Sequence, residues 1–396
     1  MLLKTISTYA MTNQNQPIAL LGNITPAHFL SEYWQKKPFL IRNAIPDFKD
    51  LLSANDLAGL SCEDDVQARV VSQNQSAKKN PWNLIDGPFD EDFFSHLPAQ
   101  DWTLLVQSVN HHLPAATSLL TQFNFIPHAR LDDLMVSYAP DGGGVGPHFD
   151  SYDVFLLQGL GKRLWRISEQ QDLSLIENAP LKILSNFVTE QEYILEAGDM
   201  LYLPPHVAHW GIAIGDCMTY SIGFRAPKAQ ELGVEFLGFM QDKIQLNGIY
   251  KDPDLSLQAH PSEVSAAMVG QVSEMLNAIT WGDDLIAEFL GVYLSEPKPD
   301  VVFEPPRKLS PEKFNQQLEQ KPILLALKSQ MLCYKSQYFI NGEHILATAG
   351  LFPCMQKLAD ARCLEVTKEN LNIDDKSALY KKLHDYYLLG YLTFKN

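Results

Sequence analysis

The chain has 396 residues, of which 46% are hydrophobic and 20% are charged. This composition is typical of a folded globular protein and excludes a disordered or fibrous chain. The formal net charge of −16 at pH 7 disfavours nucleic-acid binding over the whole surface and favours a basic partner.

The cysteines and the apolar segments narrow the class further. The five cysteines form no C-x-x-C pair, so the sequence predicts neither a disulfide framework nor a cysteine zinc site. The first residues lack the pattern of a signal peptide, and no stretch approaches the ~20 apolar residues of a membrane span. We therefore expect a cytoplasmic protein that does not contact a membrane.

Residues 1–227 are dominated by strand patterns. Helices are expected at 26–34 and 51–60. Strand patterns follow at 134–139, 154–157, 162–167, 199–203 and 218–224. The first of these alternates apolar and other side chains, which predicts a half-buried strand, and the turn at 159–161 predicts a hairpin between the second and the third. Short strands at this spacing indicate a sandwich or a barrel.

Residues 228–296 have the apolar period of helices. Leu232, Phe236 and Met240 recur every four residues, and similar patterns surround Met268 and Phe289. Three amphipathic helices must bury their apolar stripes. They do so either against the barrel and one another or in a dimer interface, and the sequence leaves both alternatives open.

A proline-rich linker and a small tail complete the chain. Residues 297–309 hold four prolines and are expected to form an extended spacer. In residues 310–396, Ser310 begins a helix and Asn341-Gly342 predicts a hairpin. Helices with a hairpin are similar to a winged helix, but this segment holds 11 Lys and Arg against 9 Asp and Glu. We therefore expect a module for protein contact or packing and no direct DNA binding.

Two glycine-containing segments carry the chemistry. In the first, His148 and Asp150 are two residues apart, so an extended chain places both side chains on one face. The second ends in His209. Together the two segments resemble the paired motifs of the cupin superfamily, matched at Gly142, His148, Asp150, Gly198, Pro204 and His209. His206 stands where that pattern has glycine and is a rival ligand, although the register favours His209.

Two histidines and one carboxylate can hold a metal ion. His148, Asp150 and His209 have the composition of the facial triad of non-haem iron(II) oxygenases, which leaves coordination positions open for a co-substrate and O₂. Zinc is the alternative, but structural zinc sites are normally closed by four ligands. We expect Fe(II).

Arg163 follows on a strand and faces the same side as Trp165. A cation that points into a barrel requires an anion, because burying an unpaired charge is unfavourable. The anion is either an Asp or Glu side chain or the far carboxylate of 2-oxoglutarate, which suits the planar guanidinium. Ser137 and Ser221 on neighbouring strands are candidate hydrogen-bond partners of 2-oxoglutarate, and the alternative is that they bond backbone or water.

The resemblance becomes narrower when more of the chain is considered. Residues 33–42, 131–138, 142–155, 158–159, 162–166 and 220–227 resemble the bacterial ribosomal oxygenases, which are JmjC-type enzymes. The resemblance implies an α+β protein with a cupin/JmjC double-stranded β-helix (1–227), a helical dimerisation domain (228–296) and, after the linker, a winged-helix-like domain (310–396). It also implies a homodimer.

The same resemblance implies the reaction. Members of the family use Fe(II), 2-oxoglutarate and O₂ to hydroxylate a side chain of a ribosomal protein, and release succinate and CO₂. It implies an arginine of ribosomal protein uL16 as the substrate. Asp133 and Asp153, which we expect near the mouth of the barrel, are candidate partners of its guanidinium, and the alternative is that they are strand-end surface or turn residues. Two alternatives remain open: a JmjC-type hydroxylase of another protein or of tRNA, and a metal-binding cupin module without enzymatic activity.

Overall fold

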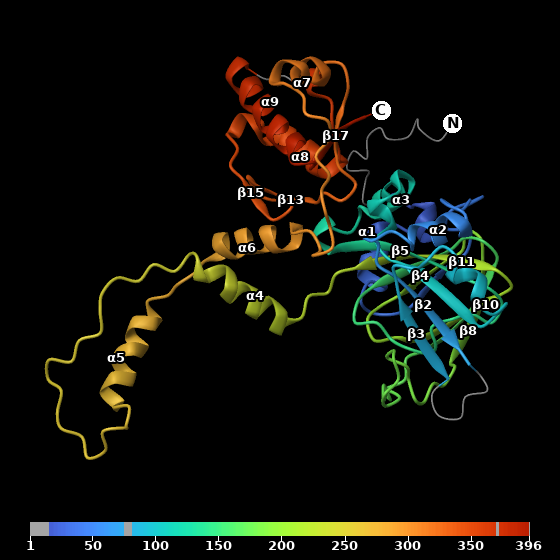
Figure 1. Ribbon diagram of the computed structural model, residues 1–396, viewed down its shortest axis with the longest axis horizontal. Helices are drawn as coiled ribbons and strands as arrows, with labels where there is room; N and C mark the ends of the chain where they lie inside the picture. The colour runs from blue at the N-terminus through green and yellow to red at the C-terminus, as the bar shows by residue number, and fades with distance from the viewer. Residues whose placement is uncertain (1–15, 75–80, 370–371, 396) are drawn as a thin grey trace.

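A computed structural model describes residues 16–74, 81–369 and 372–395. Figure 1 shows three parts: a two-sheet body, a helical segment that projects from it, and a small C-terminal domain. The mixed α+β class and the barrel-like body agree with the sequence prediction. No helix in the described part of the chain is long and apolar enough to cross a membrane.

Two helices lead into the body. The first begins at the predicted residue, and the second begins three residues later than predicted, after Ser53. Helix α1 (Pro26–Glu32) is capped by the Thr25 hydroxyl, which accepts from the backbone N–H of His28. Helix α2 (Ala54–Leu60) has a capping box that pairs Ser53 with Asp56. Such caps satisfy N–H groups that have no partner within the helix. A third short helix, α3 (Pro114–Leu120), precedes β5 in the chain.

The body is made of two antiparallel sheets. The large sheet has the order β1-β9-β6-β11-β5-β4-β2-β3 and the small sheet the order β10-β7-β8. The large sheet contains β1 (Phe39–Ile41), β2 (Ala68–Gln73), β3 (Trp82–Asp86), β4 (Trp102–Val106), β5 (Leu131–Ala139), β6 (Val154–Gln158), β9 (Met200–Leu203) and β11 (Cys217–Phe224). The small sheet contains β7 (Lys162–Ser168), β8 (Gln191–Glu196) and β10 (Ala208–Ile214). Apolar residues of the facing strands, such as Leu156, Trp165 and Leu201, pack between the sheets.

The predicted hairpin at 159–161 is wrong. Strand β6 pairs with β9 and β11, whereas β7 pairs with β8 and β10. The chain therefore crosses from the large to the small sheet at this turn. Gly161 has φ +66°, and a Cβ there would lie 2.0 Å from the carbonyl oxygen of Asp216, so glycine is required for the crossing.

Strand β5 is more buried than its alternation predicts. Leu134 and Val136 lie in the core, but Ser137 and Ala139 on the other face are buried as well. The second face is covered because it looks toward the small sheet. The half-buried prediction therefore fails on the face that lines the cavity between the sheets.

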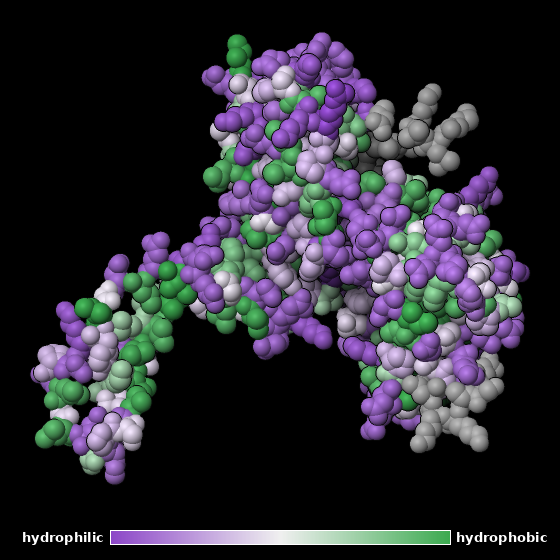
Figure 2. Space-filling model, viewed as in Figure 1, coloured by the Kyte–Doolittle hydropathy of each residue, from purple (hydrophilic) through white to green (hydrophobic). Residues whose placement is uncertain are grey.

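Helices α4 (Ala229–Gln241), α5 (Ala266–Asn277) and α6 (Asp283–Ser295) follow, as predicted. Helix α4 contacts α6, whereas α5 lies on a segment that projects from the rest of the molecule (Figure 1). Apolar side chains gather on this projecting segment (Figure 2). The exposed apolar residues of these helices include Val234 and Leu237 on α4 and Val269 and Leu276 on α5. The helices therefore do not bury their apolar stripes on the barrel.

The C-terminal domain has its own apolar core. It contains helices α7 (Pro311–Leu318), α8 (Phe352–Ala361) and α9 (Ile373–Leu388). One sheet pairs β12 (Ile323–Leu325) with β16 (Cys363–Leu364) and β17 (Leu392–Phe394), and another joins β13 (Met331–Tyr334), β14 (Gln337–Ile340) and β15 (Glu343–Ile345). The predicted Asn341-Gly342 turn connects β14 and β15, with φ +49° and +85°, as a tight hairpin turn requires. The linker 297–309 forms no helix or strand.

Candidate active site

Two histidines and one carboxylate meet at the mouth of the barrel. His148 and Asp150 lie in the loop between β5 and β6, and His209 lies on β10. The backbones of His148 and His209 exchange two hydrogen bonds, of 2.9 and 2.7 Å. Their ligand atoms and those of Asp150 all lie within 4.8 Å of one another. The three predicted residues are therefore brought together as one cluster.

Both imidazoles are oriented through their Nδ1 atoms. Nδ1 of His148 lies 3.0 Å from the carbonyl oxygen of Gly146, and Nδ1 of His209 lies 3.0 Å from that of Val207. Such bonds fix the ring and leave Nε2 free to bind a metal. Burial and the neighbouring His148 lower the pKa of His209 to about 4, so this ring is neutral at pH 7, as a ligand must be. The donor set fits a divalent transition metal.

His206 does not join this cluster. Its ring lies against Phe149, with ring centroids 5.8 Å apart, and among the described residues the metal-ligand cluster contains only the three residues above. Its backbone N–H donates to the carbonyl oxygen of Asp150, and its φ is +67°. This left-handed conformation explains why glycine suits the position. The register argument for His209 thus agrees with the geometry.

The cluster opens into a cavity of about 600 Å³ between the sheets. Ser137, His148, Asp150, Arg163, His209 and Ser221 all line it. This volume is typical of a site for a small organic ligand. Six residues that are scattered over 85 positions of the sequence therefore face one space.

Arg163 is a buried cation without a carboxylate partner. Its side chain comes from β7 and the residue is only 4% exposed. Its Nε and Nη2 donate to Sγ of Cys217 at 3.4 and 3.3 Å, and among the described residues it forms no ion pair. The alternative of a buried ion pair with Asp or Glu is therefore not found. Because thiol sulfur is a weak acceptor, Arg163 is available for an anion.

The two predicted carboxylates lie in different places. Asp133 lines the cavity, where its Oδ2 accepts from the N–H and the hydroxyl of Ser108 at 3.0 Å. Asp153 is 0% exposed and does not line the cavity. Its carboxylate accepts from the Tyr202 hydroxyl at 2.6 Å and pairs with Arg130. The expectation that Asp153 lies near the mouth is not met, because this carboxylate is used to satisfy buried polar groups.

Comparison with known proteins identifies the family. Residues 118–232 match the JmjC domain, and residues 274–393 match the ROXA-like winged helix. The ribosomal protein uL16 3-hydroxylase of Escherichia coli K12 is 35% identical over 322 residues, which cover 80% of this chain and 84% of that protein. The chain belongs to the ribosomal oxygenase family.

Other ribosomal oxygenases extend the comparison. A probable ribosomal oxygenase of Haemophilus influenzae is 38% identical over 59% of this chain and 56% of its own. The X-ray structure of E. coli YcfD superposes with a TM-score of 0.82 at 32% identity, and the match covers 93% of this chain and 98% of that one. YcfD in complex with cobalt and 2-oxoglutarate gives a TM-score of 0.80 at 31% identity, with the same coverage. The JmjC/cupin body and the winged helix are thus confirmed for this ribosomal oxygenase.

Two residues of the cavity, Arg69 and Thr103, carried no signal in the sequence, and Trp165 was recognised only as a neighbour of Arg163 on the same face. Three residues that line this cavity each have a buried polar atom with no hydrogen-bond partner in the described structure: Nε of Arg69, Oγ1 of Thr103 and Nε1 of Trp165. Buried polar atoms are normally bonded, so these atoms indicate that the cavity receives a polar ligand. They come from β2, β4 and β7, and no local motif marks them.

Proposed function

We propose that this ribosomal oxygenase is an Fe(II)- and 2-oxoglutarate-dependent dioxygenase that hydroxylates an arginine of ribosomal protein uL16. The co-products are succinate and CO₂. The observation that carries the proposal is the juxtaposition of the His148, Asp150 and His209 cluster with the unpaired Arg163 in one cavity. The E. coli relative is a ribosomal protein uL16 3-hydroxylase, which supports this substrate.

The residues of the cavity fall into two groups, one for the metal ion and one for 2-oxoglutarate. His148, Asp150 and His209 hold Fe(II), which when bound supplies the activation of O₂. Arg163 binds the far carboxylate of 2-oxoglutarate as a planar bidentate donor. Ser137 and Ser221 are buried and line the same cavity, where their hydroxyl groups offer hydrogen bonds. The buried surroundings exclude water, which strengthens these interactions.

Charge supports a basic substrate. The chain carries −16 overall, while residues 310–396 carry a small excess of cations, so the acidic excess lies in the body and helices. A basic ribosomal protein is attracted to such a surface in the cytoplasm. Inside the cavity we assign Asp133, whose residue lines it, to the incoming guanidinium.

A homodimer is the second part of the proposal. The projecting helices leave large apolar side chains in solvent, among them Leu237 at 62% exposure, and a second copy would cover them. Light scattering with size-exclusion chromatography is expected to give twice the chain mass. Leu237→Glu places a charge in this interface and is expected to shift the protein toward the monomer.

Mass spectrometry of ribosomal proteins tests the activity. Ribosomal proteins from cells that lack the gene are incubated with the protein, Fe(II), 2-oxoglutarate and O₂, with His148→Ala as the control. A gain of one oxygen on an arginine of uL16, absent from the control, is the expected result.

The other outcomes separate the alternatives. Consumption of 2-oxoglutarate with no gain of oxygen on uL16 would overturn the ribosomal substrate and leave a JmjC-type hydroxylase of another protein or of tRNA. No consumption of 2-oxoglutarate would leave a metal-binding module without enzymatic activity.

A further inference from the structure

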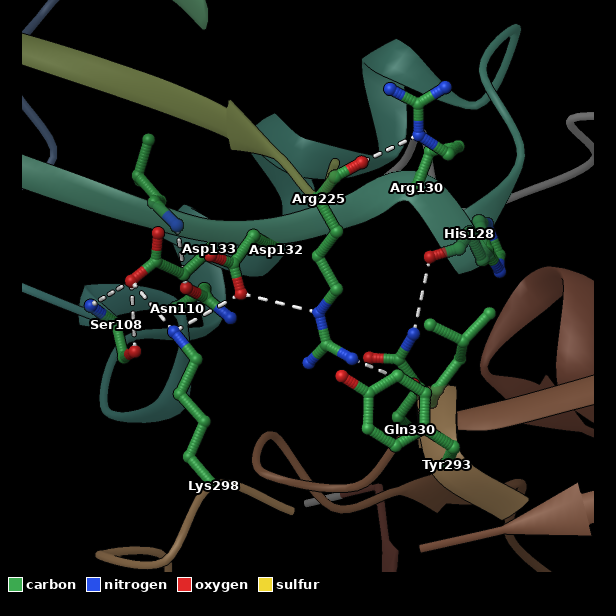
Figure 3. Close-up of polar contacts among 12 residues, drawn as sticks. Ser108, Asn110, His128, Arg130, Asp132, Asp133, Arg225, Tyr293, Lys298 and Gln330 are labelled. Atoms are coloured by element: carbon green, nitrogen blue, oxygen red, sulfur yellow. Dashed lines mark hydrogen bonds and ion pairs between the residues drawn. The ribbon is translucent and has the colours of Figure 1, made fainter. Parts of the chain in front are cut away.

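A lysine from the linker reaches the mouth of the catalytic cavity. Lys298 lies three residues after the end of α6, and its side chain points to Asp132 and Asp133 on β5 (Figure 3). Its Nζ lies 3.2 Å from Oδ1 of Asp132 and 3.4 Å from Oδ2 of Asp133. All three residues line the cavity that contains the metal-ligand cluster. The linker between two parts of the chain thus supplies a cation to the site.

Asp132 and Asp133, the acid pair, can accept more hydrogen bonds than Lys298 donates to them. Asp133 is 9% exposed, and its Oδ2 already accepts from Ser108 and Lys298. Within the part of the chain that the structure describes, no hydrogen bond reaches its Oδ1. Asp132 has a second partner in Arg225, whose Nε lies 3.4 Å from Oδ1. Among the described residues, Oδ1 of Asp133 and Oδ2 of Asp132 therefore remain open to a further donor.

The contact between Lys298 and the two carboxylates is weak enough for another cation to replace the lysine. Both Nζ distances exceed the 2.7–2.9 Å of strong charge-assisted hydrogen bonds, and the Lys298 side chain is 28% exposed. A lysine ammonium is a hydrated point charge, whereas a guanidinium presents a planar fork that binds a carboxylate through two bonds. An arginine side chain that enters the cavity has the geometric advantage for the same oxygens.

We propose that Lys298 is a resident competitor for the substrate's cation. In the free enzyme it neutralises the buried charge of Asp133, and the guanidinium of the substrate displaces it. Lys298 thereby sets the affinity of the enzyme for its substrate without touching the reacting carbon. This inference rests on the proposed function, because it assigns Asp133 to the cationic side chain of the substrate.

Two substitutions distinguish competition from a structural role. Lys298→Met removes the competitor, so the KM for uL16 is expected to fall about two- to fivefold with kcat unchanged, in keeping with a partly exposed ion pair. Lys298→Arg makes the competitor stronger, so KM is expected to rise. A structural role gives the reverse pattern, with the methionine variant impaired and the arginine variant intact, and would overturn the proposal.

The matched control is Lys357→Met. It removes another ion-paired lysine, 2.7 Å from Glu369 in the winged helix, and is expected to leave both kinetic constants unchanged. Equal changes in the control and in Lys298→Met would attribute the effect to net charge and overturn the competition.

Lysine labelling tests the displacement itself. Acetic anhydride reacts with exposed amines, and mass spectrometry reports each lysine separately. Addition of purified uL16 is expected to raise the labelling of Lys298 several-fold and to leave Lys357 unchanged. Protection of Lys298, or no change in it, would contradict displacement.

The failure of the proposed function is recognised separately. Hydroxylation of uL16 by the unaltered protein is measured first, and its absence rejects the substrate. The labelling is then repeated with N-acetylarginine amide at saturating concentration, whose guanidinium tests the contact alone. Increased labelling of Lys298 supports the competition, and unchanged labelling rejects it.

Discussion

The guanidinium of Arg163 in the catalytic cavity has no ion-pair partner among the described residues. In the part of the chain that the structure describes, the sulfur of Cys217 is the only hydrogen-bond acceptor of Arg163, and its guanidinium lies over the Trp165 ring at 5.8 Å. A neighbouring arginine on the same strand, Arg166, instead forms a surface ion pair with Glu192 at 2.8 Å. Because side chains alternate between the two faces of β7, Arg163 points into the cavity and Arg166 points to solvent.

Arg163→Met is expected to raise the KM for 2-oxoglutarate at least about 30-fold. The reason is that losing the charge-assisted bonds to a buried carboxylate costs about 2 kcal/mol or more. Steady-state kinetics with 2-oxoglutarate varied measures it. Arg166→Met is the matched control and is expected to change KM less than about twofold; an equal effect of both variants would contradict the assignment.

His206 is held in a backbone conformation that disfavours it. With φ +67°, a residue with a Cβ is strained by about 1 kcal/mol relative to glycine. His206→Gly is expected to raise the free energy of unfolding by about 0.5 kcal/mol, after allowance for the greater freedom of glycine in the unfolded chain. Urea unfolding measures the change. Metal affinity is expected to stay constant, and a weakened affinity would make His206 a ligand after all.

At the scale of elements, α6 connects the helical segment to the C-terminal domain. It packs on β13 and β14, and the match to the winged-helix family begins at residue 274, so it includes α6. Gly291 makes this approach close. A Cβ there would lie 2.2 Å from Cδ2 of Phe339, which leaves no room for any other residue.

Gly291→Ala is expected to lower the free energy of unfolding by about 1 to 3 kcal/mol, because a methyl group would overlap a buried ring. Gly233→Ala in α4 is the control, since nothing lies within 4 Å of its Cβ position. This second variant is expected to gain about 0.5 to 1 kcal/mol from helix propensity. Urea unfolding of both measures the difference, and a loss of similar size in both would show that the close approach is unimportant.

At the scale of the whole molecule, the body and the C-terminal domain meet through polar contacts. Lys328 pairs with Asp65 at 2.7 Å, and Nε2 of Gln330 donates to the carbonyl oxygen of His128 at 3.2 Å (Figure 3). His111 lines a second, smaller pocket at this junction. Burial, together with the cations of Lys298 and Lys328, lowers the pKa of His111 to about 4. The junction therefore holds a histidine that is neutral at pH 7.

Acid is expected to weaken this junction. As the pH falls below 6.5, His111 becomes protonated in the unfolded chain. In the folded chain it stays neutral until the pH approaches its pKa of about 4. Stability is therefore lost between these values, by about 1 to 2 kcal/mol at pH 5 from this group. His111→Gln removes the contribution. Urea unfolding at pH 7.5 and pH 5 is expected to show a smaller loss in the variant, and an equal loss would refute the assignment.

Local patterns in the sequence predicted much of the fold. The capping residue Ser310 acts within one turn of α7, and the Asn341-Gly342 turn depends only on its own backbone. The spacing of His148 and Asp150 and the register of His209 are likewise local, and the resemblance carried by these motifs identified the family. These features were predictable because neighbouring residues alone determine them.

Sheet membership and cavity lining were decided only by the tertiary structure. Whether the turn at 159–161 closes a hairpin or crosses between sheets depends on which strands lie beside β6 and β7, and these come from distant parts of the chain. The same holds for Asp153, which satisfies Tyr202 and Arg130, and for Lys298, which the linker brings to Asp133. The sequence by itself determined the ligand types and the family, because motifs are short-range. The unpaired state of Arg163 and the competitor beside Asp133 depend on long-range packing, which no local pattern encodes.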